Sequence, residues 1–572
     1  MHCSFARRLS LLGSLVAFTL LSPAAHAGVR CEELATNPAH GLAGNDVVKT
    51  VTSAIIPPSG PNASYCQVNI LYGETANQNI NIRVGLPLNA EDKGAGGVQG
   101  AWNGRTQGIG GGGCSGSTNV VGPVNAGYVG SGNDTGHVGG SCEPGVNLDG
   151  TYNLQFINDF IRNGMKQQIL FSKAVATAYY EMSPVYNYWN GCSTGGRQGY
   201  VLAQELGTEL DGILANAPAM YWTRFQTAQM WGQIVMRDLL GPYPTLPADI
   251  DRRIAKLNQA TTSAIDACDA ADGVTDRVID DPRTCKFSAT ANICGTPTAP
   301  VNNCLTPLEA EAIDKIWDGP RNSHGNKIWF GLDRGTSIPA LNGPTPFALG
   351  VTQFHWDEHD RNFDWREVSA DEYPQVAQDG SRNIADVTDT FGNLDTFRAS
   401  GGKLLTFVGA NDQLIMPRGV IHYYRQMATR YSNHDKPDFN RLQDFFRLFR
   451  APGVAHCGGG GPNAPQPQNL FGALVDWVEN GVAPDQILGQ TTVSGAPRTR
   501  PICPYPQTAV YSGEGSTDDA ANFSCGGNLE KLHTVCDDAL TEYKDELSGE
   551  LDYTGMGVNP VACRNTARGP KR

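Results

Sequence analysis

The sequence predicts a protein of the α/β class, built on a mostly parallel sheet that a large insertion interrupts. Strand-like and helix-like segments alternate along much of the chain, which is the pattern of βαβ units. Ser193 lies in the sequence Gly-Cys-Ser-Thr-Gly, between a predicted strand and a predicted helix. A serine framed by glycines at a strand-to-helix turn is typical of the α/β-hydrolase fold. We therefore predict an α/β-hydrolase fold with a large inserted lid domain and several disulfides.

The first 27 residues are predicted to be a secretory signal peptide. Arg7 and Arg8 precede an apolar run over 9–21, and Ala25-His26-Ala27 supplies the small residues of a cleavage site. We expect cleavage after Ala27 and a protein that is secreted or periplasmic. No later apolar run approaches the ~20 residues of a membrane helix, so no membrane is expected as a partner.

The cysteines indicate a disulfide-bonded protein. The chain has 15 cysteines, and the loss of Cys3 with the signal peptide leaves an even number in an oxidising compartment. Disulfides are therefore favoured over a zinc site. Local spacing favours the pairs Cys268 with Cys285, Cys294 with Cys304, Cys503 with Cys525 and Cys536 with Cys563. The pairing of four cysteines stays open, namely Cys31, Cys66, Cys114 and Cys142.

Charge and length restrict the functional classes. The formal net charge is −14, and an acidic chain without basic runs disfavours nucleic acid as a partner. The chain of 572 residues, even without its signal peptide, exceeds what one hydrophobic core usually supports. We therefore expect a catalytic domain that carries an insertion.

The elements are predicted in chain order from their hydrophobic periodicity. Alternating apolar residues on both sides of a Gly-Glu-Thr-Ala-Asn turn predict an antiparallel hairpin over 67–87. Helical spacing follows over 154–178. The next strand, helix and strand are predicted over 185–189, 194–206 and 212–215.

A change of composition marks the insertion. Between residues 242 and 384, clusters of Pro, Gly, Asn and Asp replace the alternating pattern. The sheet pattern then resumes, with a strand, a helix, a strand and a helix predicted over 403–408, 419–430, 446–449 and 470–480. The predicted parts are a signal peptide (1–27), a catalytic domain (28–241 and 385–525), an inserted lid domain (242–384) and a C-terminal tail (526–572).

Ser193, Asp412 and His456 are the candidate catalytic residues. A serine hydroxyl needs an adjacent base, and the base needs a carboxylate to orient it. Asp412 and His456 each follow a predicted strand, and the order Ser, Asp, His is that of α/β-hydrolases. The ordinary alternatives are a chance motif in a Gly-rich chain, a turn-forming Asp and a hydrogen-bonded His. Cys192 precedes Ser193 and Cys457 follows His456, so a partnership of serine and histidine would bring the two sulfurs close enough to bond.

Acyl transfer also needs two backbone donors for the developing oxyanion. The amide of Thr194, directly after the serine, is one candidate. The glycine run 110–113 is the candidate source of the other, because glycines let backbone amides turn toward a ligand. A flexible loop is the ordinary alternative for this run.

An acidic loop over 268–278 is a candidate cation site. Its carboxylates recur at three-to-four-residue spacing beside Gly273 and Cys268, which suits a hard cation such as Ca²⁺ in a structural role. A solvated acidic turn is the alternative.

The chain resembles the tannase and feruloyl esterase family, which includes mono(hydroxyethyl) terephthalate hydrolases. The resemblance is carried by Cys192-Ser193, Asp412 and His456-Cys457, and by Trp102-Asn103-Gly104-Arg105 before the glycine run. It implies a disulfide between the two cysteines beneath the catalytic residues.

The resemblance also implies roles for backbone groups. By its register, Gly113 supplies the second oxyanion amide. For the acidic loop it implies a calcium ion, held by carboxylates and by backbone carbonyls. The carboxylates are those of Asp269, Asp272 and Asp276, and the carbonyls are those of Val274 and Val278.

The function that the resemblance implies is a secreted serine esterase that hydrolyses carboxylic esters of aromatic acids through an acyl-enzyme. Feruloyl (hydroxycinnamoyl) or galloyl esters are the expected substrates, free or attached to plant polysaccharide or polyphenol. A mono(hydroxyethyl) terephthalate-type half-ester hydrolase is one alternative, and Ile415 stands where that branch carries a phenylalanine. A noncatalytic binding module on a hydrolase scaffold is another. Phe354, Trp356 and Phe363 are lid candidates for binding the aromatic ring.

Overall fold

A computed structural model describes residues 29–530, apart from 324, 326, 384–392, 435 and 462. The predicted signal peptide (1–27), most of the predicted tail (526–572) and the predicted Cys536–Cys563 bridge lie outside these residues.

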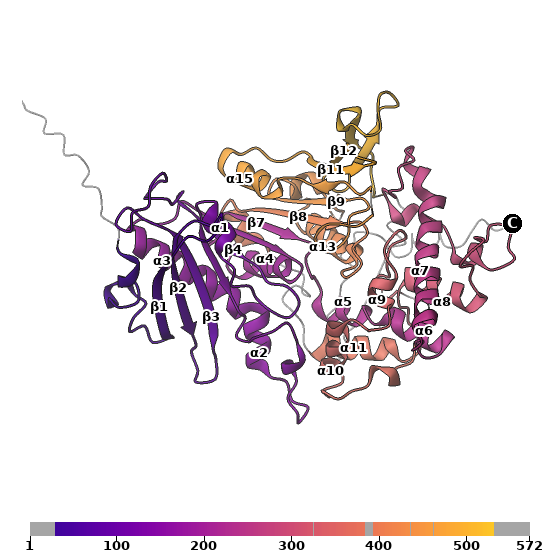
Figure 1. Cartoon of the computed structure of the whole chain (residues 1–572), viewed down its shortest axis with the longest axis horizontal. Helices are drawn as coiled ribbons and strands as arrows, with labels where there is room; N and C mark the ends of the chain where they lie inside the picture. Colours follow the sequence, from indigo (N-terminus) through magenta and orange to yellow (C-terminus); the bar gives the residue numbers. More distant parts are fainter. Residues whose placement is uncertain are drawn as a thin grey trace, which may run out of the picture.

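The described residues form a central sheet of nine strands, in the order β1-β2-β3-β5-β4-β6-β7-β8-β9 (Figure 1). Strands β1, β2, β3 and β5 pair antiparallel, and the remaining neighbours from β5 through β4 to β9 pair in parallel. The predicted α/β fold with a mostly parallel sheet is confirmed. The strand bounds are β1 Val48–Ile56, β2 Tyr65–Tyr72, β3 Ile80–Pro87, β4 Arg105–Ile109, β5 Val129–Asn133, β6 Tyr186–Cys192, β7 Gly212–Asn216, β8 Lys403–Gly409 and β9 Phe446–Ala451.

Helices cover both faces of this sheet. Successive residues of a strand face opposite sides, so the central strands are apolar on both. Trp189 and Ile213 belong to the hydrophobic cluster formed with α4 and α13, whereas Tyr188 and Leu214 pack in a second cluster with Leu474 of α15. Figure 1 shows α15 on one side of the strands and α4 with α13 on the other. The helix bounds are α3 Gly164–Tyr180, α4 Thr194–Glu205, α13 Pro417–Arg430 and α15 Leu470–Asn480.

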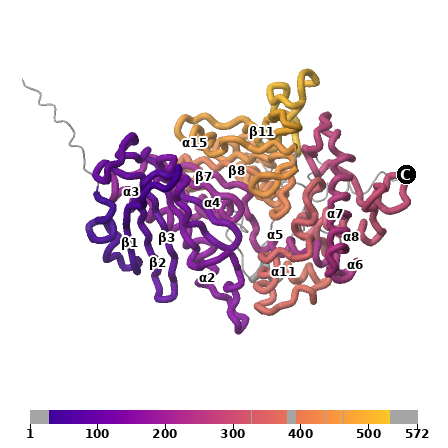
Figure 2. Tube along the Cα trace, viewed as in Figure 1, coloured from indigo at the N-terminus to yellow at the C-terminus, as the bar shows by residue number. Residues whose placement is uncertain are grey.

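The large insertion lies between the neighbouring strands β7 and β8. Its regular elements, within the described residues, are helices: α5 Trp222–Ala228, α6 Trp231–Leu240, α7 Pro247–Cys268, α8 Pro307–Asp318, α9 Pro339–Asn342, α10 Ala348–Asp357, α11 Tyr373–Asn383 and α12 Asp395–Ala399. Helix α8 begins at a capping box, in which Thr306 and Glu309 bond each other's backbone amides, and Pro307 occupies its first turn. The tube in Figure 2 places α6, α7 and α8 at one end of the molecule and β1–β3 at the other.

The insertion shares its core with the sheet. One hydrophobic cluster contains Trp189 and Leu404 from the strands together with Trp317 and Phe354 from α8 and α10. Topologically the insertion already begins after Asn216, so α5 and α6 belong to it although the composition changes only near residue 242.

Six disulfides lie within the described residues. Three are the predicted local bridges, Cys268–Cys285, Cys294–Cys304 and Cys503–Cys525. The others are Cys31–Cys66, Cys114–Cys142 and Cys192–Cys457. The four N-terminal cysteines therefore pair in sequence order.

The C-terminal part adds two small antiparallel sheets. The strands are β10 Gln466–Pro467, β11 Ile487–Val493 and β12 Ala496–Ile502 in one, and β13 Thr508–Tyr511 with β14 Phe523–Gly526 in the other. The second is a short hairpin, in a region for which the sequence analysis predicts no strand. Its strand β14 contains Cys525, whose bridge to Cys503 ties the hairpin to the end of β12.

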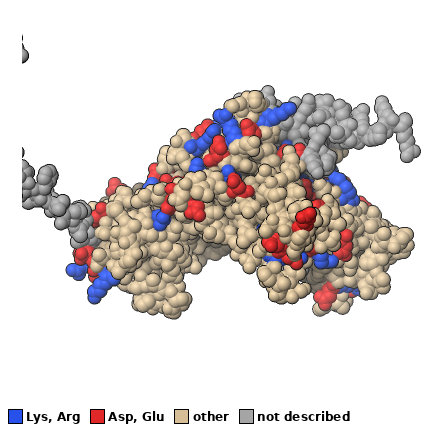
Figure 3. Space-filling model, turned by 90° about the horizontal axis from the view of Figure 1, so that it is seen from above, with Lys and Arg blue, Asp and Glu red and all other residues tan. Residues whose placement is uncertain are grey.

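The surface carries both signs of charge. On the face in Figure 3, acidic and basic side chains are interspersed among many neutral ones. None of the helices described is long and apolar enough to cross a membrane.

Candidate active site

Ser193 occupies the sharp turn between β6 and α4. Its backbone is at φ 63°, ψ −124°, a conformation that a non-glycine residue adopts only under strain. Hydrogen bonds on both sides hold this turn, since the Ser193 amide donates to the Asn216 carbonyl at 3.0 Å and the Ser193 carbonyl accepts from Ala219 at 3.1 Å. A Cβ on Gly191 would come 2.4 Å from the Gly195 backbone, so this close turn excludes a side chain there. The geometry is that of a nucleophile elbow.

His456 and Asp412 form a hydrogen-bonded pair at the carboxyl ends of β9 and β8. The His456 Nδ1 lies 2.8 Å from the Asp412 Oδ2, and Asp412 is only 2% exposed. The other carboxylate oxygen accepts the amides of Leu414 at 2.9 Å and Ile415 at 2.8 Å, which fixes the carboxylate plane. Because a carboxylate only accepts, Nδ1 is the donor in this pair, and Nε2 is left as the basic nitrogen.

A disulfide brings the serine and histidine loops together. Cys192 and Cys457 are bonded, with their Cα atoms 6.0 Å apart. Ser193 follows the first cysteine directly and His456 precedes the second directly. The bridge that the family resemblance implies is therefore present, and it links the two loops that carry the candidate nucleophile and base.

The glycine run 110–113 packs against the first turn of α4. A Cβ on Gly110 would lie 2.4 Å from the Gly195 Cα, whereas one on Gly112 would meet nothing within 4 Å. The Gly195 amide donates to the Gly111 carbonyl at 2.9 Å, and the Gly111 amide donates to the Gln198 Oε1 at 2.9 Å. The run is thus held beside the serine turn and is not a free loop.

Gly113 and Thr194, the two candidate oxyanion residues, are in contact. The Thr194 hydroxyl donates a short hydrogen bond to the Gly113 carbonyl. Gly113 has φ +60°, a conformation that favours glycine. The next residue is anchored by the Cys114–Cys142 bridge. The structure therefore places both residues next to Ser193.

The insertion reaches this site through α10. The Leu349 Cδ1 is 3.9 Å from the position that a Cβ on Gly113 would take. Phe354 and Trp356 of the same helix are 0% and 1% exposed, and the Trp356 indole donates to the Cys142 carbonyl at 2.9 Å. These two rings are packed in the core, so the expectation that they bind substrate is wrong. Phe363 is half-buried against the same core.

The acidic loop is folded around its own backbone. One oxygen of Asp269 accepts the amides of Asp276, Arg277 and Val278, at 2.8 to 3.2 Å. The Asp272 Oδ1 accepts the amide of Val274 at 2.9 Å.

Buried charge surrounds this loop. The Asp276 Oδ2 is 2.6 Å from the Arg500 guanidinium. Burial raises the pKa of Asp272, Asp276 and Asp280, and mutual repulsion adds to the shift. No group of three or more acidic, His or Cys side chains in the described part of the chain is spaced to hold a metal by those side chains alone.

Sequence reasoning missed several neighbours of the site. Gln413 accepts the His456 amide through its Oε1 at 3.1 Å, and Gln198 holds the glycine run. Arg500 joins the acidic loop from a distant segment, and Asp280 lies two residues beyond the end of the loop. Single polar residues such as these carry no periodicity, and only their adjacency to a motif, as for Gln413 after Asp412, could have indicated them.

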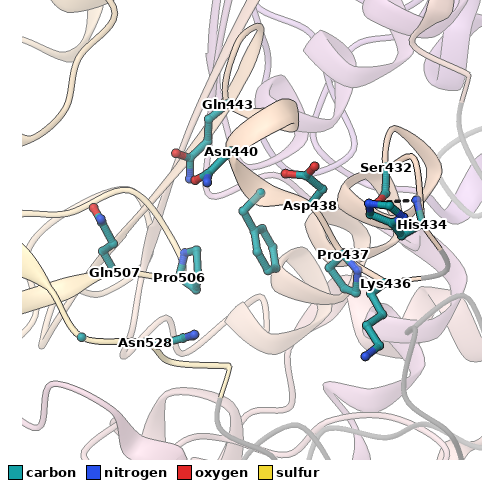
Figure 4. Close-up of a pocket in the computed structure, with 12 residues that line it drawn as sticks. Ser432, His434, Lys436, Pro437, Asp438, Asn440, Gln443, Pro506, Gln507 and Asn528 are labelled. Carbon is teal, nitrogen blue, oxygen red and sulfur yellow. Dashed lines mark hydrogen bonds between the residues drawn. The ribbon is translucent and has the colours of Figure 1, made fainter.

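A large hollow lies away from these residues. It measures about 820 Å³ and is lined by Ser432, His434, Lys436, Pro437, Asp438, Phe439, Asn440, Gln443, Pro506, Gln507, Gly527 and Asn528. Figure 4 shows these side chains around an open, mostly polar space. Eight of these residues lie between the end of α13 and the start of β9, at the amino edge of the parallel strands, and the other four flank β13 and β14. In open α/β sheets ligands bind at the carboxyl edge, where Ser193, Asp412 and His456 lie, so we assign the hollow no part in catalysis.

The fold and the order of the site residues define an α/β-hydrolase. The pattern of the family described as "Tannase and feruloyl esterase" matches residues 98–526. A "Probable feruloyl esterase" of Arthroderma benhamiae is 32% identical over 506 residues, which cover 83% of this chain and 88% of that protein. An uncharacterized esterase of Xanthomonas campestris is 32% identical over 418 residues, covering 65% and 70%. The chain belongs to the tannase and feruloyl esterase family and is a carboxylic ester hydrolase.

Solved structures share the fold. The crystal structure of an esterase from Aspergillus oryzae matches with a TM-score of 0.71 and 24% identity, covering 87% of this chain and all of that one. The tannin acyl hydrolase from Aspergillus niger matches with a TM-score of 0.72 and 22% identity, covering 88% and 94%. The predicted α/β-hydrolase architecture is therefore found in other esterases. These comparisons give no support to a noncatalytic binding module.

Proposed function

We propose that the protein is a secreted serine esterase that hydrolyses esters of aromatic acids through an acyl-enzyme, with feruloyl (hydroxycinnamoyl) or galloyl esters as substrates. The observation that carries the proposal is the 2.8 Å contact between His456 and the buried Asp412. The disulfide Cys192–Cys457 joins the loop of His456 to the turn of Ser193. The relatives named as feruloyl esterases and a tannin acyl hydrolase support the aromatic acyl group.

In the proposed reaction, the His456 Nε2 takes the proton of the Ser193 hydroxyl as its oxygen attacks the ester carbonyl carbon. Asp412 keeps the proton of Nδ1 in place and stabilises the imidazolium. The amides of Thr194 and Gly113 donate to the oxyanion of the tetrahedral intermediate. His456 then returns its proton to the leaving alcohol oxygen, and a water molecule repeats the sequence on the acyl-enzyme to release the acid.

Initial rates on three esters test this proposal. The assay compares wild type with Ser193→Ala on methyl ferulate, methyl gallate and mono(hydroxyethyl) terephthalate. The matched control is Ser59→Ala, at an exposed serine between β1 and β2. We expect wild type and control to cleave ferulate or gallate, and Ser193→Ala to cleave neither. A preference for the terephthalate half-ester would replace the substrate assignment with the alternative, and activity in Ser193→Ala would overturn the serine mechanism.

We propose a structural calcium ion at the acidic loop, held by carboxylates of Asp269, Asp272 and Asp276 and by carbonyls of Val274 and Val278. The oxygen-rich donor set fits a hard cation. Buried carboxylates that repel one another also favour a counter-ion. The Asp276–Arg500 pair neutralises part of this charge, so the ion would share Asp276 with the arginine. Its role would be to hold the base of α7 against β12.

We propose that the protein is exported and that its signal peptide is removed after Ala27. Six disulfides in the described residues support an oxidising compartment. Mass spectrometry of the exported protein tests this, with Gly28 expected as the first residue. An intact N-terminus in the mature protein would contradict it.

A further inference from the structure

Helix α10 of the insertion contacts the segment that carries the proposed oxyanion amide at two places. The Cδ1 of Leu349, in the first turn of the helix, lies 3.9 Å from the position of a Cβ on Gly113. Trp356, seven residues further along, donates its indole N–H to the Cys142 carbonyl at 2.9 Å. Seven residues make about two helical turns, so both side chains project from the same face of α10. This face therefore contacts residue 113 as well as residue 142.

The Cys114–Cys142 disulfide connects the Trp356 contact with Gly113. The two cysteines are 0% and 3% exposed, and their Cα atoms are 5.3 Å apart. Cys114 directly follows Gly113. The Cys114 amide also donates to the Gly140 carbonyl at 3.3 Å, which ties the same two stretches of backbone together. A displacement of residue 142 would therefore be passed through the covalent bridge to the backbone of Gly113.

The indole is closely fitted into the loop that follows the disulfide. Trp356 is 1% exposed, and a Cβ on Gly145 would lie 2.1 Å from its ring. The Trp356 carbonyl accepts the Tyr152 hydroxyl at 3.0 Å, and the Arg361 guanidinium lies 3.0 Å from the Glu143 carboxylate. The end of α10 is thus fastened to this loop by packing, by hydrogen bonds and by an ion pair.

An oxyanion donor contributes most when it is held in place before the reaction. Removal of one such donor costs about 10²- to 10³-fold in kcat. A misplacement of about 1 Å costs on the order of 10²-fold. Gly113 has φ +60°, one of several conformations open to a glycine, so neighbouring residues have to fix it.

We propose that Trp356 is a positioning residue, which holds the Gly113 amide toward the oxyanion through Cys142 and the disulfide. This role rests on the proposed function, because it requires Gly113 to supply that amide. Trp356 itself touches no substrate, since its ring is buried in the core. The inserted helix α10 then takes part in the chemical step through its hold on the oxyanion segment.

Steady-state kinetics on p-nitrophenyl acetate test the proposal, because hydrolysis of this activated ester needs the oxyanion site but no aromatic acid. Trp356→Phe keeps a ring and removes the indole N–H. We expect it to lower kcat about tenfold and to leave KM within about twofold, because oxyanion stabilisation acts in the transition state. The Cys142 carbonyl still accepts the Gly145 amide at 2.9 Å, so the variant leaves no buried carbonyl unpaired.

Trp231→Phe is the matched control. The Trp231 indole also donates to a carbonyl of the insertion, that of Lys315, at 2.9 Å, and Trp231 is 8% exposed. This hydrogen bond links α6 to α8 and involves no residue of the oxyanion segment. The control should lose a similar amount of thermal stability and keep its kcat. Equal losses of kcat in the two variants, or unchanged kcat in folded Trp356→Phe, would overturn the proposal.

A double-mutant cycle tests the route through the disulfide. We expect Cys114→Ala/Cys142→Ala to lower kcat by itself. In that background Trp356→Phe should cause no further loss, because the connection to Gly113 is already broken. Additive losses would show that Trp356 acts by another route and would overturn the part assigned to the disulfide.

Gly145→Ala perturbs the same contact from the opposite side, and it keeps the proposal testable if Trp356→Phe does not fold. Its methyl group would displace the indole, so kcat should fall while KM stays unchanged. Gly122→Ala, where a Cβ meets nothing within 4 Å, should behave as wild type. Unchanged kcat in Gly145→Ala would contradict the positioning role. If wild type cleaves p-nitrophenyl acetate but no aromatic ester, the proposed substrate is wrong and the positioning test is unaffected.

Discussion

The Asp412 carboxylate holds His456 by one oxygen and two backbone amides by the other, so its orientation is set before any substrate binds. Because the two carboxylate oxygens have different partners, the effect of an asparagine at position 412 can be predicted. In Asp412→Asn, the Oδ1 can still accept the amides, but an NH₂ group then faces Nδ1 and forces the proton onto Nε2. Nε2 could no longer accept the serine proton.

We therefore predict that Asp412→Asn lowers kcat by about 10³- to 10⁴-fold without unfolding the protein. Steady-state kinetics on the cleaved ester and near-UV circular dichroism provide the measurements. Asp476→Asn, at an exposed position of α15, is the matched control and should keep full activity. Normal turnover in Asp412→Asn would remove Asp412 from the mechanism.

The Cys192–Cys457 bridge should matter for turnover as well as stability. Its loss frees two loops that are 265 residues apart in sequence, so the distance between base and nucleophile is less well defined. We expect the double variant Cys192→Ala/Cys457→Ala to lose at least about tenfold in kcat and a few kcal/mol of stability. Cys294→Ala/Cys304→Ala, which removes a local bridge in the insertion, should keep its kcat. Unchanged turnover in a soluble first variant would argue against a positioning role.

The glycine run offers a comparison between neighbouring positions. Gly110→Ala places a methyl group 2.4 Å from the Gly195 backbone, whereas Gly112→Ala meets open space. We predict that Gly110→Ala lowers the free energy of unfolding by about 2 kcal/mol or more, and that Gly112→Ala changes it by less than about 0.5 kcal/mol. Urea unfolding of both variants measures the difference. Equal stabilities would mean that the run is not packed against α4.

Calcium and pH should act together on stability. Burial raises the pKa of Asp272 and Asp280, so above the ordinary aspartate value of about 4 the folded chain binds more protons than the unfolded chain. Their contribution to the free energy of unfolding therefore falls as pH rises through this window. Calcium, which favours the ionised carboxylates, should reverse that fall.

Thermal unfolding tests this coupling. In EDTA we expect the calcium-free protein to lose stability from about pH 5 to about pH 8 through these groups, and calcium to raise Tm more at the higher pH. Asp281 and Asp318 have lowered pKa values, so their opposite slope lies below the ordinary aspartate value of about 4 and outside this window. Asp280→Asn is the comparison that isolates the loop. A calcium effect of equal size at both pH values would contradict the assignment.

Much of the sheet could be predicted because its strands carry strong patterns. The hairpin expected over 67–87 is β2 with β3, and the helix expected over 470–480 is α15. Strand β5 was not predicted, since its sequence Val-Gly-Ser-Gly-Asn has one apolar side chain. Its glycines are required by packing, as a Cβ on Gly132 would lie 2.0 Å from the Ser117 carbonyl.

In the candidate site, too, some residues could be predicted from the sequence and others could not. Ser193, Asp412 and His456 could be placed because each follows a strand and the order of the three is informative. Leu349 and Arg500 could not, because they reach the glycine run and the acidic loop only through tertiary packing. The ring-binding expectation for Phe354 and Trp356 failed for a related reason, since an aromatic residue near a site is as readily a core residue.

The core that the insertion shares with the sheet limits how substrate preference can change in this chain. Side chains of α8 and α10 belong to the same hydrophobic cluster as those of β6 and β8, so the inserted helices are no exchangeable module. Transplanting them into a relative would leave large apolar surfaces unmatched on both sides. New specificity in such a protein is therefore reached by substitutions within the existing lid, made one side chain at a time around the segment that presents Leu349 to the glycine run.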